Sequence, residues 1–190
     1  MVPNLKLYVG PMFSGKSTKL LEQVDRYQIA KKNVFCVKPV MDSRYSSEGY
    51  IVTHNNNHLK CFMVSTGKQL LETFEQENTK HKIDVLAVDE AFMIDNIDKT
   101  LLDLFYTYKV DVLVSSIDMS ASKIPFESIS TLLSHATHIK KCKAVCTACG
   151  SDASYTARKF ELDKNNEQIR VGGSDLYEPR CLKHHSDIDL

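Results

Sequence analysis

The fold of this chain is decided by one stretch near its start, Gly10-Pro11-Met12-Phe13-Ser14-Gly15-Lys16-Ser17-Thr18. It fits the pattern G-x-x-x-x-G-K-[ST], with an apolar run before it and a helical pattern after it. The glycines turn the backbone so that its N–H groups face phosphate oxygens. Lys16 supplies a positive charge for the outer phosphates, and the Ser17 hydroxyl is a Mg²⁺ ligand. All nine residues are therefore predicted to bind a nucleotide.

Bulk composition limits the classes of protein to which this chain can belong. It has 190 residues, of which 43% are hydrophobic, which suits one packed domain with a small appendage. Lys and Arg total 24, and so do Asp and Glu, so the net charge is zero and argues against a broad nucleic-acid-binding face. No apolar run is long enough to cross a bilayer, and no leader pattern opens the chain. We expect a cytoplasmic protein without a nucleic-acid or membrane partner.

Strand-like and helix-like patterns alternate through the first two thirds of the chain. Strands are predicted at 5–9, 34–37, 83–88 and 110–115, and helices at 16–32, 69–76, 97–108 and 126–135. This alternation predicts an α/β fold, with a mostly parallel sheet covered by helices on both faces. The polar segment 42–60 is predicted to be a long connection that orders on binding a ligand. Short strands organised by Cys and His follow, so we place a domain boundary between 1–138 and 139–190.

An acidic pair follows the predicted strand at 83–88. Asp89 should project from the carboxyl edge of the sheet toward the Mg²⁺, and Glu90 beside it is a candidate general base. The alternative is that the pair merely ends a strand at the surface.

Two short metal-binding patterns lie in the last third of the chain. Cys146-x-x-Cys149 and Cys181-x-x-His184 offer three thiolates and an imidazole, which is a closed tetrahedral set for a structural Zn²⁺. His185 competes with His184 for the fourth position. Separate free cysteines are the alternative.

Several further short motifs are spread along the chain in a fixed order. They are Lys38-Pro39 with Asp42-Ser43-Arg44-Tyr45, Val88-Asp89-Glu90-Ala91, Ile117-Asp118 with Pro125-Phe126, Lys143-Ala144-Val145-Cys146, and Val171-Gly172-Gly173-Ser174-Asp175-Leu176-Tyr177. Together with the glycine-rich stretch, these motifs resemble the zinc-containing thymidine kinases of animal cells, bacteria and large DNA viruses, over nearly the whole chain.

The resemblance implies a P-loop NTPase-like α/β domain followed by a zinc-binding lobe with a lasso-like loop. It implies transfer of the γ-phosphate of ATP to the 5′-hydroxyl of thymidine, which supplies DNA precursors by salvage. Mg²⁺ and structural Zn²⁺ would be cofactors, dTTP a feedback inhibitor, and the assembly a homotetramer.

The same resemblance implies roles for individual residues. Glu90 would be the catalytic base, with Lys16 and Arg44 as catalytic cations, and Ser17 and Asp89 would hold Mg²⁺. The substrate-binding residues would be Met12, Asp42, Phe126, Val171, Gly172, Gly173, Ser174 and Tyr177. Without the family, 171–177 would be an ordinary turn and Arg44 a solvated loop charge.

The chain also departs from the family pattern around the nucleoside. Phe92 stands in place of a glutamine, Met93 in place of an aromatic residue, and Ala121 in place of another aromatic residue. These changes leave two alternatives open: a kinase for another pyrimidine deoxynucleoside, or a catalytically impaired nucleotide-binding regulatory protein.

Overall fold

The computed structural model describes residues 2–41, 49–52, 58–159 and 172–185. Its centre is a six-stranded sheet in the order β5-β2-β6-β7-β1-β8, in which every neighbouring pair is parallel. The strands are β1 (Leu5–Val9), β2 (Val34–Pro39), β5 (Phe62–Val64), β6 (Val85–Val88), β7 (Asp111–Ser116) and β8 (His138–Lys141). The prediction of an α/β fold with a mostly parallel sheet is confirmed.

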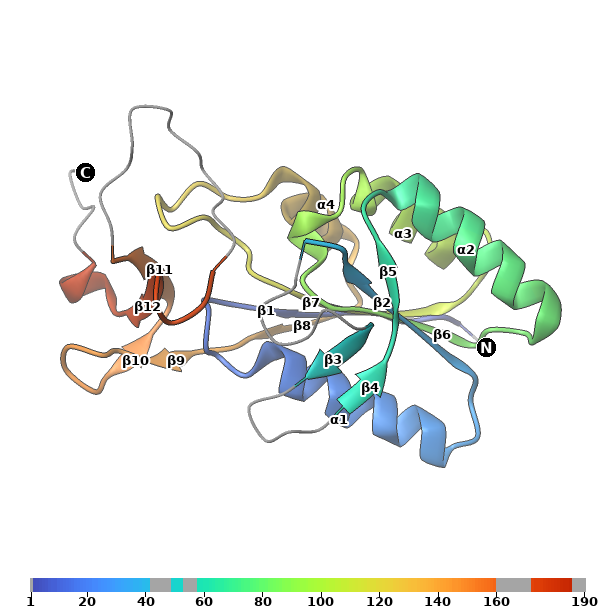
Figure 1. Cartoon of the computed structure of the whole chain (residues 1–190), viewed down its shortest axis with the longest axis horizontal. Helices are drawn as coiled ribbons and strands as arrows, with labels where there is room; N and C mark the ends of the chain where they lie inside the picture. The colour runs from blue at the N-terminus through green and yellow to red at the C-terminus, as the bar shows by residue number, and fades with distance from the viewer. Residues whose placement is uncertain (1, 42–48, 53–57, 160–171, 186–190) are drawn as a thin grey trace.

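Helices cover both faces of this sheet (Figure 1). Helix α1 (Lys16–Ile29) lies on one face, where Leu20 and Val24 pack in a cluster with residues of β1, β2, β6 and β7. The other face carries α2 (Gly67–Lys80), α3 (Ile97–Tyr106) and α4 (Glu127–His135). Their apolar sides form the larger core with the alternate residues of the same strands. The four inner strands β1, β2, β6 and β7 are buried on both faces, which explains their nearly continuous apolar runs, whereas the edge strand β8 is exposed.

Three central strands bring distant parts of the chain to one edge of the sheet. Strands β6, β7 and β1 are neighbours and run in the same direction, so their carboxyl ends meet. The glycine-rich stretch follows β1, and Asp89 follows β6. Ligands of open parallel sheets bind at this edge, so the topology places the candidate site there.

The segment 42–60 contains more regular structure than its composition predicts. Strands β3 (Tyr50–Val52) and β4 (His58–Lys60) form an antiparallel pair, and β5 then joins the main sheet beside β2. The prediction of one long connection is therefore wrong for 49–52 and 58–60, while 42–48 and 53–57 lie outside the described residues. Strands of three residues are too short to show a period-two pattern, and they are stabilised by pairing with each other rather than by the propensity of either segment.

Helix α2 begins before the predicted residue 69. Thr66 caps it by accepting a hydrogen bond from the Gln69 N–H, at 3.2 Å, and the Gln69 side chain accepts from the Ser65 N–H, at 2.8 Å. The pattern Thr-x-x-Gln is a known helix-start signal and predicts this earlier start.

The last part of the chain forms two small antiparallel ribbons beyond the end of the sheet (Figure 1). One pairs β9 (Ala144–Val145) with β10 (Asp152–Ala153), and the other pairs β11 (Tyr155–Arg158) with β12 (Tyr177–Arg180). We call residues 144–159 and 172–185 the C-terminal lobe. The proposed domain boundary after 138 falls inside β8, which is the edge strand of the main sheet.

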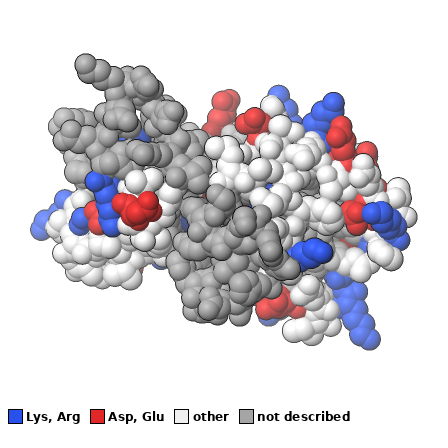
Figure 2. Space-filling view, viewed as in Figure 1, with Lys and Arg blue, Asp and Glu red and all other residues white. Residues whose placement is uncertain are grey.

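The described helices are too short and too polar to cross a membrane. On the face drawn in Figure 2, basic and acidic side chains are interspersed over the described surface.

Candidate active site and metal centre

The glycine-rich stretch forms a tight loop between β1 and α1. Gly10 has a φ of 147° and Gly15 a φ of 75°, which are conformations that side-chain-bearing residues rarely adopt. A Cβ at Gly10 would overlap the Cys142 carbonyl oxygen, so only glycine permits this close approach. Helix α1 starts directly after Gly15 without a side-chain cap, which leaves its first N–H groups available to an anion.

Lys16 folds back over the loop. Its ammonium group donates a hydrogen bond to the Pro11 carbonyl oxygen at 2.7 Å, and the Ser14 hydroxyl donates to the same oxygen at 2.8 Å. The Lys16 side chain is buried, with an exposed fraction of 5%. The lysine is thus held where a phosphate in the loop would lie within its reach.

Ser17 and Asp89 meet across the sheet edge. The Ser17 hydroxyl donates to Asp89 Oδ1 at 2.9 Å, and the Asp89 N–H donates to the Val37 carbonyl oxygen at 3.0 Å. Adjacent oxygen ligands of an octahedral Mg²⁺ with bonds of 2.0–2.1 Å lie about 2.9 Å apart, so this pair fits a shared Mg²⁺. Asp89 is buried at the end of β6, as the sequence pattern suggested.

Glu90 lies directly beside this pair. Its backbone is left-handed, with a φ of 49°, and it precedes a single helical turn, η1 (Ala91–Met93). Strained backbone of this kind is concentrated at functional sites. The turn is supported from β7, where the Ser116 hydroxyl accepts a hydrogen bond from the Phe92 N–H at 3.2 Å.

Phe92 and Phe126 form an aromatic pair next to this turn. Their ring centroids lie 4.8 Å apart and their planes are tilted by 38°. Phe126 is one of the predicted substrate residues, and Phe92 is one of the departures from the family pattern. The structure therefore packs the Phe92 ring against the Phe126 ring. Of the other two positions that depart from the family pattern, Met93 is half-buried and Ala121 is buried.

Part of the predicted substrate-covering loop is described. The carbonyl oxygen of Gly173 accepts hydrogen bonds from the N–H groups of Leu176 and Tyr177, at 3.1 and 3.0 Å, which closes a turn. Tyr177 is buried on β12, and the Ser174 carbonyl oxygen accepts from the Lys159 ammonium group at 2.7 Å. Gly172 and Gly173 lie in the same turn, whereas the predicted residues Val171, Arg44 and Asp42 lie outside the described residues.

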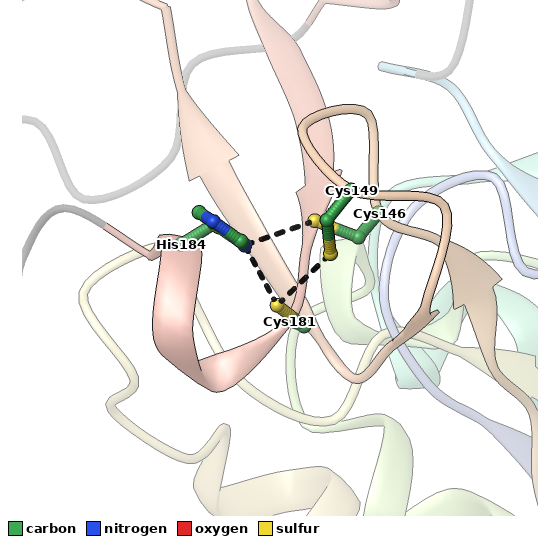
Figure 3. A group of neighbouring side chains, drawn as sticks. All are labelled: Cys146, Cys149, Cys181 and His184. Atoms are coloured by element: carbon green, nitrogen blue, oxygen red, sulfur yellow. Dashed lines mark hydrogen bonds between the residues drawn. The ribbon is translucent and has the colours of Figure 1, made fainter.

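The four predicted metal ligands come together in the C-terminal lobe (Figure 3). Cys146, Cys149, Cys181 and His184 place one ligand atom each within 4.8 Å of all the others. The His184 Nδ1 lies 3.2 Å from the Cys181 Sγ and 4.0 Å from the Cys146 Sγ, and the Cys149 and Cys181 sulfurs are 3.8 Å apart. This donor set and its compactness fit Zn²⁺.

The two neighbouring histidines have different surroundings. His184 faces the sulfurs, whereas His185 is buried and its Nε2 donates to the Thr156 carbonyl oxygen at 3.1 Å. The geometry thus favours His184, the residue that the Cys-x-x-His spacing selected, over its competitor His185.

The electrostatics of the cluster also suit a metal. Burial disfavours the Cys146 thiolate, but the backbone N–H groups of Cys181, Ala148 and Cys149 outweigh burial and lower the Cys146 pKa to about 6. A metal-binding cysteine must be a thiolate, so this environment favours the ligand form.

Thr156 is a contact residue that the motifs did not predict. Its hydroxyl oxygen accepts a hydrogen bond from the Met12 N–H at 3.0 Å, across 144 positions of sequence. A threonine in a short strand carries no local signal of such a contact, so only the fold reveals it.

Known proteins resemble this chain over nearly its whole length. The thymidine kinase family model matches residues 3–185. A thymidine kinase of Aster yellows witches'-broom phytoplasma (strain AYWB) is 30% identical over 190 residues, covering 97% of this chain and 88% of that protein. The matched range includes the glycine-rich loop, the Asp89-Glu90 pair and the Cys/His cluster. The chain belongs to the thymidine kinase family.

Proposed function

We propose that this protein transfers the γ-phosphate of ATP to the 5′-hydroxyl of thymidine. The observation that carries the proposal is the contact between Ser17 and Asp89, 2.9 Å long, with Glu90 next in the chain. It brings the end of the phosphate-binding loop and an acidic pair to one point. Phosphoryl transfer needs this combination of a metal-binding pair and a nearby base.

Each residue has a separate task in this proposal. The loop N–H groups and Lys16 would hold the outer phosphates of ATP, and Ser17 and Asp89 would hold Mg²⁺. When bound, Mg²⁺ would neutralise charge on the phosphate oxygens. Glu90 accepts the proton of the 5′-hydroxyl as that oxygen attacks the γ-phosphorus, and the bond from the γ-phosphorus to the β–γ bridging oxygen breaks to release ADP. Arg44, carried over from the family pattern, would add positive charge during transfer.

The thymidine pocket is proposed from the remaining substrate residues. Phe126, with Phe92 packed against it, would form an aromatic wall for the base. The turn at 172–177 would cover the nucleoside through main-chain groups, with Met12, Asp42, Ser174 and Tyr177 completing the enclosure. Enclosure of the nucleoside keeps water away from the γ-phosphate.

The remaining proposals concern the assembly and its surroundings. Cys146, Cys149, Cys181 and His184 would hold a structural Zn²⁺ that anchors the lobe. We propose a homotetramer, feedback inhibition by dTTP and a cytoplasmic location, with the family resemblance as support, and reduced thiol ligands suit that compartment.

The test is the release of ADP from Mg-ATP by purified protein, with thymidine, deoxyuridine, deoxycytidine or no acceptor. We predict thymidine-dependent turnover that falls at least about 100-fold in Glu90→Gln, because a positioned general base contributes on this order. Glu72→Gln, on the exposed side of α2, is the matched control and should keep wild-type turnover.

The other outcomes separate the alternatives. Turnover with deoxyuridine or deoxycytidine only would move the assignment to that nucleoside. Absence of acceptor-dependent turnover in folded, zinc-loaded protein that binds ADP would identify a nucleotide-binding regulatory protein instead.

A further inference from the structure

One peptide unit in the glycine-rich loop is held from both sides. The Pro11 carbonyl oxygen accepts hydrogen bonds from the Lys16 ammonium group and the Ser14 hydroxyl, at 2.7 and 2.8 Å. The N–H of the same peptide unit belongs to Met12, and it donates to the Thr156 hydroxyl oxygen at 3.0 Å. The peptide group is planar, so a contact that fixes its N–H also fixes the direction of its carbonyl oxygen.

This geometry connects Thr156 to Lys16 through a single rigid group. If the N–H lost its partner, the plane would be held only through its carbonyl oxygen and would rotate more easily, and the carbonyl that holds the Lys16 ammonium group would move with it. Lys16 is the cation proposed for the outer phosphates. The effect of Thr156 would therefore appear as nucleotide affinity, although it lies outside the nucleotide-binding loop.

Thr156 is itself fixed by the C-terminal lobe. It is buried, with an exposed fraction of 4%, and its strand β11 pairs with β12, opposite Pro179. Its carbonyl oxygen accepts from the His185 Nε2 at 3.1 Å, and the His185 ring packs edge-on against Tyr155. A buried carbonyl needs a donor, and His185 supplies one from the residue that directly follows His184 of the Cys/His cluster.

We propose that Thr156, supported by His185, is a positioning residue that orients the Pro11–Met12 peptide and through it Lys16. The C-terminal lobe then sets the geometry of the phosphate-binding loop, in addition to covering the nucleoside. This inference rests on the proposed binding of a nucleotide by that loop.

The test compares Thr156→Val, which removes the acceptor and keeps the shape, with Thr156→Ser, which keeps the hydroxyl. Affinity for Mg-ADP is measured by calorimetry without any nucleoside, so thymidine contacts do not contribute. We expect Thr156→Val to weaken ADP binding about fivefold, the size typical of one hydrogen bond, and Thr156→Ser to stay within about twofold of wild type.

The matched control is Thr137→Val. The Thr137 hydroxyl oxygen accepts from the Leu5 N–H at 3.0 Å, which is the same kind of bond at the opposite end of β1. This variant should bind ADP as wild type does. Zinc content and the thermal unfolding of each variant are measured on the same samples.

A second pair of variants tests the support from His185. His185→Phe removes the donor and should weaken ADP binding, whereas His185→Gln places an amide N–H near the position of Nε2 and should restore it. This pair provides the test if Thr156→Val does not fold.

Several results would overturn the inference. They are equal ADP affinity in Thr156→Val and Thr137→Val, failure of serine to restore binding, or a wild-type protein that binds no ADP. A wild-type protein that binds ADP but does not phosphorylate thymidine would refute the proposed function alone, because the titration involves no phosphoryl transfer.

Discussion

Phe92 provides an aromatic ring beside the predicted substrate residue Phe126. It stands where the pattern has a glutamine, while the neighbouring position, usually aromatic, is Met93. The structure places the Phe92 ring 4.8 Å from that of Phe126, and Ser116 holds the Phe92 backbone. An aromatic surface is therefore present beside the predicted substrate residue, although it comes from a different position.

At the residue scale we predict that Phe92→Ala raises the thymidine KM about tenfold, because it removes an aromatic pair and its buried surface. The kcat should change less, since Phe92 takes no part in proton or phosphoryl transfer. Steady-state kinetics with thymidine as the varied substrate measure both. Tyr106→Ala removes a half-exposed aromatic ring on α3 and should leave this KM unchanged. An unchanged KM in Phe92→Ala would place the thymidine base elsewhere.

At the element scale, the C-terminal lobe contains little that could stabilise it alone. Its ribbons pair two residues of β9 with two of β10, and four of β11 with four of β12. Among the residues that the structure describes, the apolar cluster of this lobe consists of Ala144, Cys146 and Ala153, with Cys181 packed against it. Elements with so small a core usually depend on a metal or a disulfide.

We therefore predict that Cys149→Ser loses bound zinc and lowers the unfolding temperature by roughly 10 °C. A loss of about 3–5 kcal/mol shifts the midpoint by ~2–4 °C per kcal/mol in a protein of this size. Zinc content by elemental analysis and calorimetric unfolding provide the two measurements. Cys142→Ala, outside the Cys/His cluster, should keep its zinc. A Cys149→Ser protein with the full zinc content would show that the cluster is not the metal site.

At the scale of the whole molecule, stability depends on the two cores that share one sheet. Phe74 of α2 is fully buried between helix and sheet, and its ring makes edge contacts with Phe35 and Tyr108 at 6.0 and 5.5 Å. Phe62 touches the same Phe35 ring at 4.8 Å, but its exposed fraction is 41%. The two phenylalanines thus differ mainly in burial.

We predict that Phe74→Ala lowers the free energy of unfolding by about 3–5 kcal/mol, because it leaves a cavity in the core. Phe62→Ala should cost about 1 kcal/mol or less, since its ring is already partly in water. Urea unfolding monitored by circular dichroism measures both. Equal destabilisation by the two variants would contradict the burial argument. The kcat of the folded fraction should be unchanged in both, because neither ring contacts the candidate site.

The sequence by itself determined the features that depend on neighbours in the chain. Short spacings predict the glycine-rich loop, the apolar strands on either side of α1, the acidic pair after β6 and the two short metal-binding patterns. Each of these features is built from a few residues that are close together in the sequence, so the sequence pattern is enough to predict it. The family match over residues 3–185 covers all of these motifs.

Only the tertiary structure decided which distant residues meet. It separated His184 from His185, set Phe92 against Phe126, placed β5 in the sheet beside β2, and joined Thr156 to the loop at Met12. Each of these contacts depends on how strands and helices pack, and a residue's type and its neighbours do not encode that packing. Long-range contacts form only when the whole fold offsets the entropy of ordering the chain between them, so they are properties of the molecule rather than of any segment.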